Sequence, residues 1–306
     1  MIRLQYRARR YMEHLSNQEL ESRAKDIFLN QLVLTEQNKI GLHPMNQEGQ
    51  YWMTVLTHLL EEYVIRFGPF PAGFPHWQIN QIRIPDPRLD AATKACEIVR
   101  KMKTEPGKYL FKYGQLSFLK QLHREGKLRI SPAGSYADPS LNSAIQDDEL
   151  SFCFTPNPAH LKLEVFDGKT GKSKGRLTPE NFQIKYEAGS NYYVFCLSNV
   201  LAPRLFLDFE ADACLLIKEP TQFVEKLIMA FEKTNTGWAG AFEPVKYLDP
   251  LNPPNNDIDV FSCKHFRYSY QKECRLIWLP HAPNQTLDYQ FLELGSLEDC
   301  SELVSI

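Results

Sequence analysis

Apolar residues in the first hundred positions recur at the three- and four-residue spacing of amphipathic helices. Ser16 and Glu19 have the spacing of a capping box and are predicted to open one helix. Two further helices are predicted over residues 50–67 and 90–102. The segment between them, residues 68–87, holds five prolines and is predicted to be mostly irregular.

The pattern changes near residue 105, after which short apolar runs typical of strands dominate. Strands are predicted over residues 109–113, 128–131, 161–166, 191–197, 213–218, 242–247, 275–279 and 287–292. Helices are predicted over residues 115–124 and 222–233. Strands mixed with a few segregated helices indicate an α+β fold. We expect an N-terminal helical region over residues 1–105 and a second domain over residues 106–306.

The composition fits a globular protein, with 43% hydrophobic and 24% charged residues. The net charge of -2 gives no global attraction to nucleic acid or to an anionic membrane. Basic residues are nevertheless concentrated in two places. Residues 101–129 carry eight Lys or Arg against two Glu, and a second run comprises Lys169, Lys172, Lys174 and Arg176. Solvated faces are the default interpretation of both runs.

The cysteines and the N-terminal sequence predict a cytoplasmic protein. There are seven cysteines and no CxxC pair, which argues against a disulfide framework or a zinc ribbon and favours a reducing compartment. No apolar core follows the basic N-terminal residues, and no apolar run approaches the roughly 20 residues that span a bilayer. We therefore expect neither a signal peptide nor a membrane partner.

Familiar catalytic and metal-binding motifs are absent from the sequence. It has no P-loop, GxGxxG, HExxH or GxSxG, and its eight histidines are scattered. Asp147, Asp148 and Glu149 offer three adjacent carboxylates, but a solvated acidic turn is the favoured interpretation over a cation site. No metal site is predicted.

Five short blocks follow one another in an order that is more specific than any one of them. They are YLFKY at 109–113, LRISP and SYADP at 128–139, YVFCLS and LFLDF at 193–209, EPVKY at 243–247, and FSCK and YQKECRLIW at 261–278. This succession resembles the bacterial family known as domain of unknown function 2971. Members of that family show a YKY strand, a helix, a turn ending in NDP, a CfS strand, a V.Y strand and a late E.E.R segment.

The family looks like a divergent branch of the ADP-ribosyltransferase fold, which has a split β-sheet core. Some of its relatives act in toxin or phage-defence systems. The resemblance covers roughly residues 108–280, and residues 1–105 match no pattern. Two positions depart from the family: Ala137 stands in place of the Asn before Asp-Pro, and Gln271 replaces the first Glu of E.E.R.

The resemblance implies an enzyme that uses NAD as a substrate and needs no metal. Glu273 would stabilise the oxocarbenium-like transition state, and Gln271 would position the acceptor from the same face if the segment is extended. A Gln side chain both donates and accepts hydrogen bonds, which favours a nucleic-acid base as the expected acceptor of ADP-ribose. The residues implied to contact NAD are Lys112, Tyr113, Ser131, Ser135, Tyr136 and Arg275.

Plainer roles compete with each of these assignments. Glu273 has a cationic neighbour on each side, Lys272 and Arg275, and can pair with either on a strand surface. Gln271 and Lys112 can face solvent, whereas Tyr113, Tyr136 and Ser131 can belong to the core or to a strand end.

Three functions follow from these alternatives. The first is an ADP-ribosyltransferase toxin or defence effector that modifies RNA or DNA in preference to protein. The second is an NAD glycohydrolase that transfers ADP-ribose to water and depletes NAD. The third is a non-catalytic interaction or sensor module on the same fold. A toxin also implies an antitoxin or regulatory partner, by analogy alone.

Overall fold

Four helices and a short hairpin form the N-terminal part of the computed structural model, which describes residues 1–69, 86–105, 107–177, 179–283 and 286–306. Their bounds are α1 Ile2–Ala8, α2 Asn17–Gln31, β1 Leu32–Leu34, β2 Ile40–Leu42, α3 Gln47–Phe67 and α4 Asp90–Met102. The predicted capping box opens α2, because Ser16 Oγ accepts a hydrogen bond from the Glu19 amide at 3.2 Å and the Glu19 carboxylate accepts one from the Ser16 amide at 2.7 Å.

The three predicted N-terminal helices are found as α2, α3 and α4, and the structure adds a short strand pair that was not predicted. The antiparallel pair β1 and β2 follows α2 directly, with Leu32 opposite Leu42. Most of the segment predicted as irregular, residues 70–85, lies outside the described residues.

Strands dominate from residue 110 onward, as the sequence predicts. The strands are β3 Leu110–Gly114, β4 Lys127–Pro132, β5 Ser151–Phe154, β6 Leu163–Phe166, β7 Ser173–Leu177, β8 Ile184–Glu187, β9 Tyr193–Ser198, β10 Ala213–Ile217, β11 Trp238–Pro244, β12 Lys246–Leu248, β13 Cys263–His265, β14 Glu273–Pro280, β15 Gln290–Glu293 and β16 Ser301–Ser305. The helices among them are α5 Leu116–Glu125, α6 Pro203–Asp208 and α7 Pro220–Thr234, with short 3-10 turns at η2 Ala133–Ala137, η3 Pro158–His160, η4 Val260–Ser262 and η5 Phe266–Gln271.

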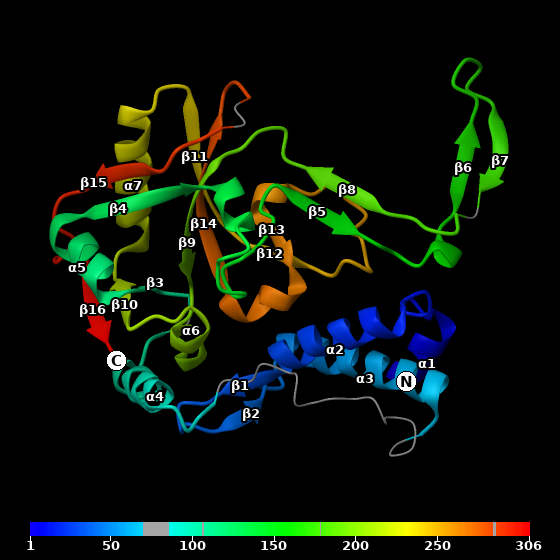
Figure 1. Cartoon of the computed structure of the whole chain (residues 1–306), viewed down its shortest axis with the longest axis horizontal. Helices are drawn as coiled ribbons and strands as arrows, with labels where there is room; N and C mark the ends of the chain where they lie inside the picture. The colour runs from blue at the N-terminus through cyan, green and yellow to red at the C-terminus, as the bar shows by residue number, and fades with distance from the viewer. Residues whose placement is uncertain (70–85, 106, 178, 284–285) are drawn as a thin grey trace.

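An eight-stranded antiparallel sheet organises this part of the molecule (Figure 1), and the α+β class is confirmed. Its main path runs β11-β14-β9-β3-β10-β16, and a side branch adds β4 and then β15. Both β3 and β4 pair with β9: Phe111 lies opposite Ser198, whereas Ser131 lies opposite Val194. The sheet therefore divides at β9, and α5 connects the two diverging strands.

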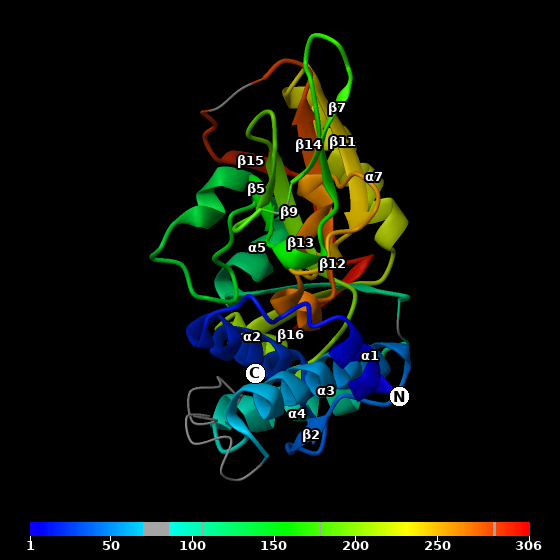
Figure 2. The same cartoon turned by 90° about the vertical axis from the view of Figure 1, so that its right-hand side faces the viewer.

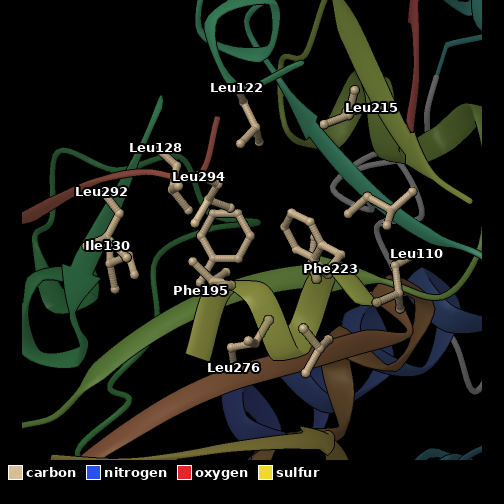
Figure 3. Close-up of a cluster of buried hydrophobic side chains, with 14 of the residues drawn as sticks. Leu110, Leu122, Leu128, Ile130, Phe195, Leu215, Phe223, Leu276, Leu292 and Leu294 are labelled. Atoms are coloured by element: carbon tan, nitrogen blue, oxygen red, sulfur yellow. The ribbon is translucent and has the colours of Figure 1, made fainter. Parts of the chain in front are cut away.

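Helices cover both faces of the sheet. On one face, α5 and α7 bury leucines and aromatic residues against the strands, and Figure 3 shows Phe195 of β9 beside Phe223 of α7 among these leucines. On the other face, α4 and α6 pack against β3 and β10, where Phe206 meets Tyr113 edge-on at 5.1 Å between ring centroids. Alternate residues of each strand thus enter different cores.

The helices α1, α2 and α3 lie together below the sheet in Figure 2 and have their own apolar core. Trp52 of α3 stacks on Phe266 of η5 at 5.6 Å, so this core includes a residue of the second region. No helix in the described part of the chain has the length and apolar character that a membrane crossing needs.

Candidate functional site

Four buried charged side chains meet at the start of β14, and we call Glu149, Lys264, Glu273 and Arg275 the buried charge cluster. Arg275 Nε donates to Glu273 Oε1 at 2.7 Å, and Arg275 Nη2 lies 2.7 Å from Glu149 Oε2. Lys264 Nζ donates to Glu273 Oε2 at 3.0 Å and lies 3.6 Å from Glu149 Oε1. Two carboxylates are therefore neutralised by two cations, as buried charges require.

Strand alternation places Glu273 and Arg275 on the same side of β14. Cys274 and Leu276 point to the opposite side, into the core that contains α7. Lys264 arrives from β13, which pairs in parallel with β12, and Glu149 precedes β5. The plain alternative of a surface ion pair is therefore wrong for Glu273, which is 6% exposed.

The cluster keeps Glu273 ionised. Burial alone would raise the pKa of this carboxyl, but Arg275 and Lys264 outweigh it and hold the pKa well below its ordinary value. The carboxylates Glu273 and Glu149 in turn raise the pKa of Lys264 well above its ordinary value against the effect of burial. All groups of the Glu273 ion pairs thus stay charged across the neutral range.

Asp147 lies at the margin of the cluster and behaves differently. Its Oδ2 is 3.9 Å from Lys264 Nζ, too far for a hydrogen bond. Burial and the neighbouring Glu149 raise the pKa of Asp147 to about 6. The acidic turn predicted at residues 147–149 is therefore solvated only at Asp148, because Glu149 is buried and Asp147 is half-buried.

A cavity of about 740 Å³ opens where β3 and β4 diverge from β9. Its walls come from β3, α5, β4, β9 and β15, and four of the residues implied to contact NAD lie in them: Lys112, Tyr113, Ser131 and Tyr136. Three cationic side chains also line it, Lys112, Lys127 and Arg129, against the single acid Glu293. Among these lining residues cations outnumber acids, although Lys127 also forms an ion pair with Glu125 at 2.8 Å.

Lys112 and Cys196 connect the cavity to the buried charge cluster. Lys112 Nζ donates to the Cys196 carbonyl oxygen at 2.8 Å and lies 4.5 Å from the centre of the Phe195 ring. Cys196 lies opposite Arg275 in the strand ladder, and Glu273 lies opposite Ser198 two residues along β9. Burial lowers the pKa of Lys112, while Glu273 acts to raise it.

The other cavity residues differ in how free they are to bind a ligand. Ser131 lies near the end of β4 and is buried, whereas Tyr136 lies in η2 and is half-buried. The Tyr113 hydroxyl is committed, because it donates to the Val200 carbonyl at 3.0 Å and accepts from the Ala202 amide at 2.9 Å. Ser135 is not a lining residue, and its hydroxyl donates to the Pro132 carbonyl at 2.7 Å.

The extended segment expected around Gln271 is not found. Gln271 ends η5, and Lys272 adopts a left-handed conformation with φ of 48°, so the alternation between residues 271 and 273 is broken. The Gln271 amide is buried and donates to the Ala144 carbonyl at 2.7 Å. The plain alternative of a surface position is therefore wrong for Gln271.

The N-terminal region holds the segment that precedes Glu273. The Asn30 side-chain amide donates to the Arg267 carbonyl and its oxygen accepts from the Tyr270 amide, both at 2.9 Å. Glu48 forms an ion pair with Lys272. These contacts fix η5, and hence the point where the chain enters β14.

Several site residues were not assigned from the sequence. Lys264 stands in the FSCK part of the fifth block, which also contains its partner Glu273, but its other carboxylate neighbour, Glu149, is distant in sequence, and its burial was not predicted. Tyr247, whose hydroxyl accepts from the Glu273 amide at 2.7 Å, ends the EPVKY block. Arg129 and Phe118 also line the cavity, one from within the LRISP block and the other from α5. Within the described residues, no group of three or more His, Cys, Asp or Glu side chains is placed to hold a metal ion.

Comparison with protein-family models finds none that matches the chain, and comparisons with curated proteins and with solved structures likewise return no match. Membership of the domain of unknown function 2971 family therefore stays a prediction.

Proposed function

We propose that this protein is an ADP-ribosyltransferase that uses NAD as a substrate and modifies a macromolecule, with a base in RNA or DNA preferred over protein. The observation that supports this most is the cavity, which gathers Lys112 of β3, Ser131 of β4 and Tyr136 of η2. The side chains of the buried charge cluster are not among its lining residues, and the link to them runs from Lys112 through the Cys196 carbonyl to the strand pair of Cys196 and Arg275. A role as a toxin or phage-defence effector, with an antitoxin partner, rests on the resemblance alone.

The chemistry of the cavity suits a dinucleotide. Its volume of about 740 Å³ lies within the range typical of small-molecule and cofactor sites. Lys112, Lys127 and Arg129 supply positive charge for a diphosphate, and Arg is well suited to bidentate contact with phosphate oxygens. Tyr136 and Phe118 offer aromatic surface for the nicotinamide or adenine ring.

In the proposed reaction, the bond between nicotinamide nitrogen and ribose C1′ breaks, and nicotinamide leaves with the bonding electron pair. A nucleophilic nitrogen or oxygen of the acceptor then bonds to C1′ and releases its proton. Positive charge develops on the ribose between these events. An ionised Glu273 stabilises that charge and accepts a hydrogen bond from a ribose hydroxyl. Arg275 and Lys264 keep the Glu273 carboxylate ionised.

One observation favours the non-catalytic module instead. Both carboxylate oxygens of Glu273 are engaged, one by Arg275 and one by Lys264, and the residue is 6% exposed. A purely structural ion pair has the same geometry. The two functions differ in whether NAD is consumed.

The test is incubation of the purified protein with NAD labelled in its adenylate part, in the presence of RNA, DNA or lysate protein. Transfer to nucleic acid is expected, and Lys112→Met is expected to lower it about 10- to 100-fold, the effect of losing one charge-assisted hydrogen bond to phosphate. Glu273→Gln should abolish transfer. Glu243→Gln, an exposed carboxylate opposite Arg275 on β11, is the matched control and should transfer label normally.

Circular dichroism and thermal melting establish which variants fold, and Lys112→Met keeps the test valid if Glu273→Gln unfolds. Label on protein alone would correct the acceptor class. Free nicotinamide without transferred label would replace the proposal with an NAD glycohydrolase. A folded wild-type protein that leaves NAD intact with all three acceptors would reject both enzymes in favour of the interaction module.

A further inference from the structure

The strands β6 and β7 form a hairpin that stands away from the main sheet. They pair only with each other, from Leu163 opposite Leu177 to Phe166 opposite Ser173, with a bulge beside Val165. Figure 1 shows this hairpin projecting beyond β5 and β8, and Figure 2 shows it rising above the body of the molecule. An isolated two-stranded hairpin is only marginally stable in water. A contribution to the core therefore does not explain the sequence of the β6–β7 hairpin.

The hairpin is strongly basic. Residues 162–177 carry five Lys or Arg against Glu164 and Asp167. Asp167 is occupied by an ion pair with Lys174 at 2.8 Å, and Glu164 accepts a hydrogen bond from Ser173 at 2.7 Å.

The remaining cations form no ion pair with any part of the chain that the structure describes. They are Lys162, Lys169, Lys172 and Arg176, and all four are exposed. This concentration of unpaired positive charge on a protein of net charge -2 indicates an anionic binding partner.

Apolar side chains are exposed between these cations. Phe166 is 57% exposed, Leu177 51% and Val165 41%, although the strands are paired. In the described structure no cluster of buried residues includes them. An exposed aromatic ring flanked by lysines provides a stacking surface together with phosphate contacts, the combination that binds unpaired nucleotides.

We propose that the β6–β7 hairpin is a binding arm for single-stranded nucleic acid. Lys169, Lys172 and Arg176 contact backbone phosphates, and Phe166 stacks on a base. The inference rests on the proposed function only in expecting a nucleic-acid acceptor, because binding by the arm requires neither NAD nor transfer.

The arrangement of the apolar residues favours nucleic acid over an anionic membrane. A hairpin that inserts into a bilayer needs apolar side chains at its tip, and the tip here, residues 167–172, contains only Asp, Gly, Lys and Thr. The apolar residues instead lie along the two paired strands, outside this tip.

The experiment measures binding of the full-length protein to a fluorescent single-stranded oligoribonucleotide by anisotropy, without NAD, from 50 to 200 mM salt. The triple variant Lys169→Gln, Lys172→Gln and Arg176→Gln is expected to bind at least tenfold more weakly. Its logarithmic salt slope should fall by about 0.7 for each phosphate that the variant no longer neutralises. Phe166→Ala is expected to weaken binding about fivefold or more at every salt concentration.

The control makes an equal charge change elsewhere, with Lys218→Gln directly after β10 and Lys226→Gln and Lys233→Gln on α7, all at exposed residues. It should bind within twofold of the wild type. Equal weakening in both triple variants would attribute binding to overall charge and reject the arm. The proposed arm would also be rejected if the hairpin variants bound the oligoribonucleotide with wild-type affinity. It would likewise be rejected if these variants lost binding only to phosphatidylserine vesicles. If the protein bound the oligoribonucleotide but transferred no ADP-ribose, the proposed enzyme would be rejected and the proposed binding arm would stand.

Discussion

Arg275 is the residue on which the buried charge cluster depends. It is fully buried, and its guanidinium donates to Glu273, to Glu149 and, at 3.1 Å, to the Phe261 carbonyl. The planar fork of the guanidinium can serve these three acceptors at once, which the single ammonium of a lysine cannot do in the same geometry. Its position therefore fixes both carboxylates.

Asp147→Asn should stabilise the protein at neutral pH. The pKa of Asp147 is raised to about 6, so between its ordinary value of 3.8 and 6 the folded state binds more protons than the unfolded state. The free energy of unfolding therefore falls as pH rises through this window, and Asn removes that fall. We expect urea unfolding to show the variant more stable than wild type at pH 7, with a smaller difference at pH 5.

Asp148→Asn is the matched control for this prediction. Asp148 is exposed and accepts from the Ser151 hydroxyl at 2.6 Å, so its replacement should not raise stability at pH 7. Burial also raises the pKa of Asp26 to about 6. Asp26 therefore lowers the free energy of unfolding of every variant as pH rises through the same window. Equal stability of wild type and Asp147→Asn at pH 7 would contradict the prediction.

At the residue scale, sequence patterns located the ion pair but not its environment. Glu273 and Arg275 were singled out by a motif, and a pairing of Glu273 with Arg275 was one of the plain alternatives to a catalytic role. The burial of Lys264 and Glu149 depends on β13 and the turn before β5 folding over β14, which no local pattern records. The position of Gln271 depends on the left-handed backbone at Lys272, where the sequence offers no glycine as a signal.

At the scale of elements, the junction of α5 and β4 sets one wall of the cavity. Gly126 ends α5 with φ of 68° and its carbonyl accepts from the Leu294 amide at 3.0 Å. A Cβ atom on Gly126 would lie 2.1 Å from the Gly295 carbonyl oxygen. This close approach brings the loop after β15 against the start of β4.

Gly126→Ala should therefore destabilise the protein by more than about 2 kcal/mol, since a left-handed residue other than glycine costs about 1–2 kcal/mol and backbone overlap adds to it. Gly171→Ala is the control, because its φ of 66° is similar and no atom would lie within 4 Å of its Cβ. Denaturant unfolding of both variants measures the difference. Equal losses would show that the overlap with Gly295 is relieved without cost.

Elements with strong local signals were predicted well. The capping box opened α2, and α4 occupies the predicted residues 90–102. Weakly patterned elements were missed. All five residues of β7 are exposed, so its sequence shows no alternation, and β1 follows the last turn of α2 without a break. The short strand β16 pairs with β10 at the sheet edge, which depends on tertiary contacts.

On the scale of the whole molecule, the N-terminal helices and the sheet are joined by buried polar contacts. Arg23 of α2 donates to both carboxylate oxygens of Asp249, at 2.8 and 2.7 Å, and both residues are almost fully buried. Arg204 of α6 donates to the Leu29 carbonyl at the end of α2. The boundary predicted near residue 105 therefore marks a change in sequence pattern. The two regions on either side of it pack against each other in a well-packed interface.

Arg23→Met should destabilise the protein by about 3–5 kcal/mol, because it leaves the Asp249 carboxylate buried without its partner. Arg88→Met removes an exposed ion pair with Asp86 and should cost no more than about 1 kcal/mol. Chemical denaturation followed by circular dichroism compares them. A single transition shifted to lower denaturant is expected for Arg23→Met, and a small loss like that of Arg88→Met would contradict the prediction.

The pairing of β15 with β4 has a consequence for synthesis of the chain. Residues 290–293 supply Phe291, Leu292 and Glu293 to the cavity, although the strand they pair with ends at Pro132. Regions that emerge first from the ribosome fold first. A nascent chain that already contains Lys112, Ser131 and Glu273 still lacks this wall, so the proposed NAD site is assembled only after residues 290–293 have been translated.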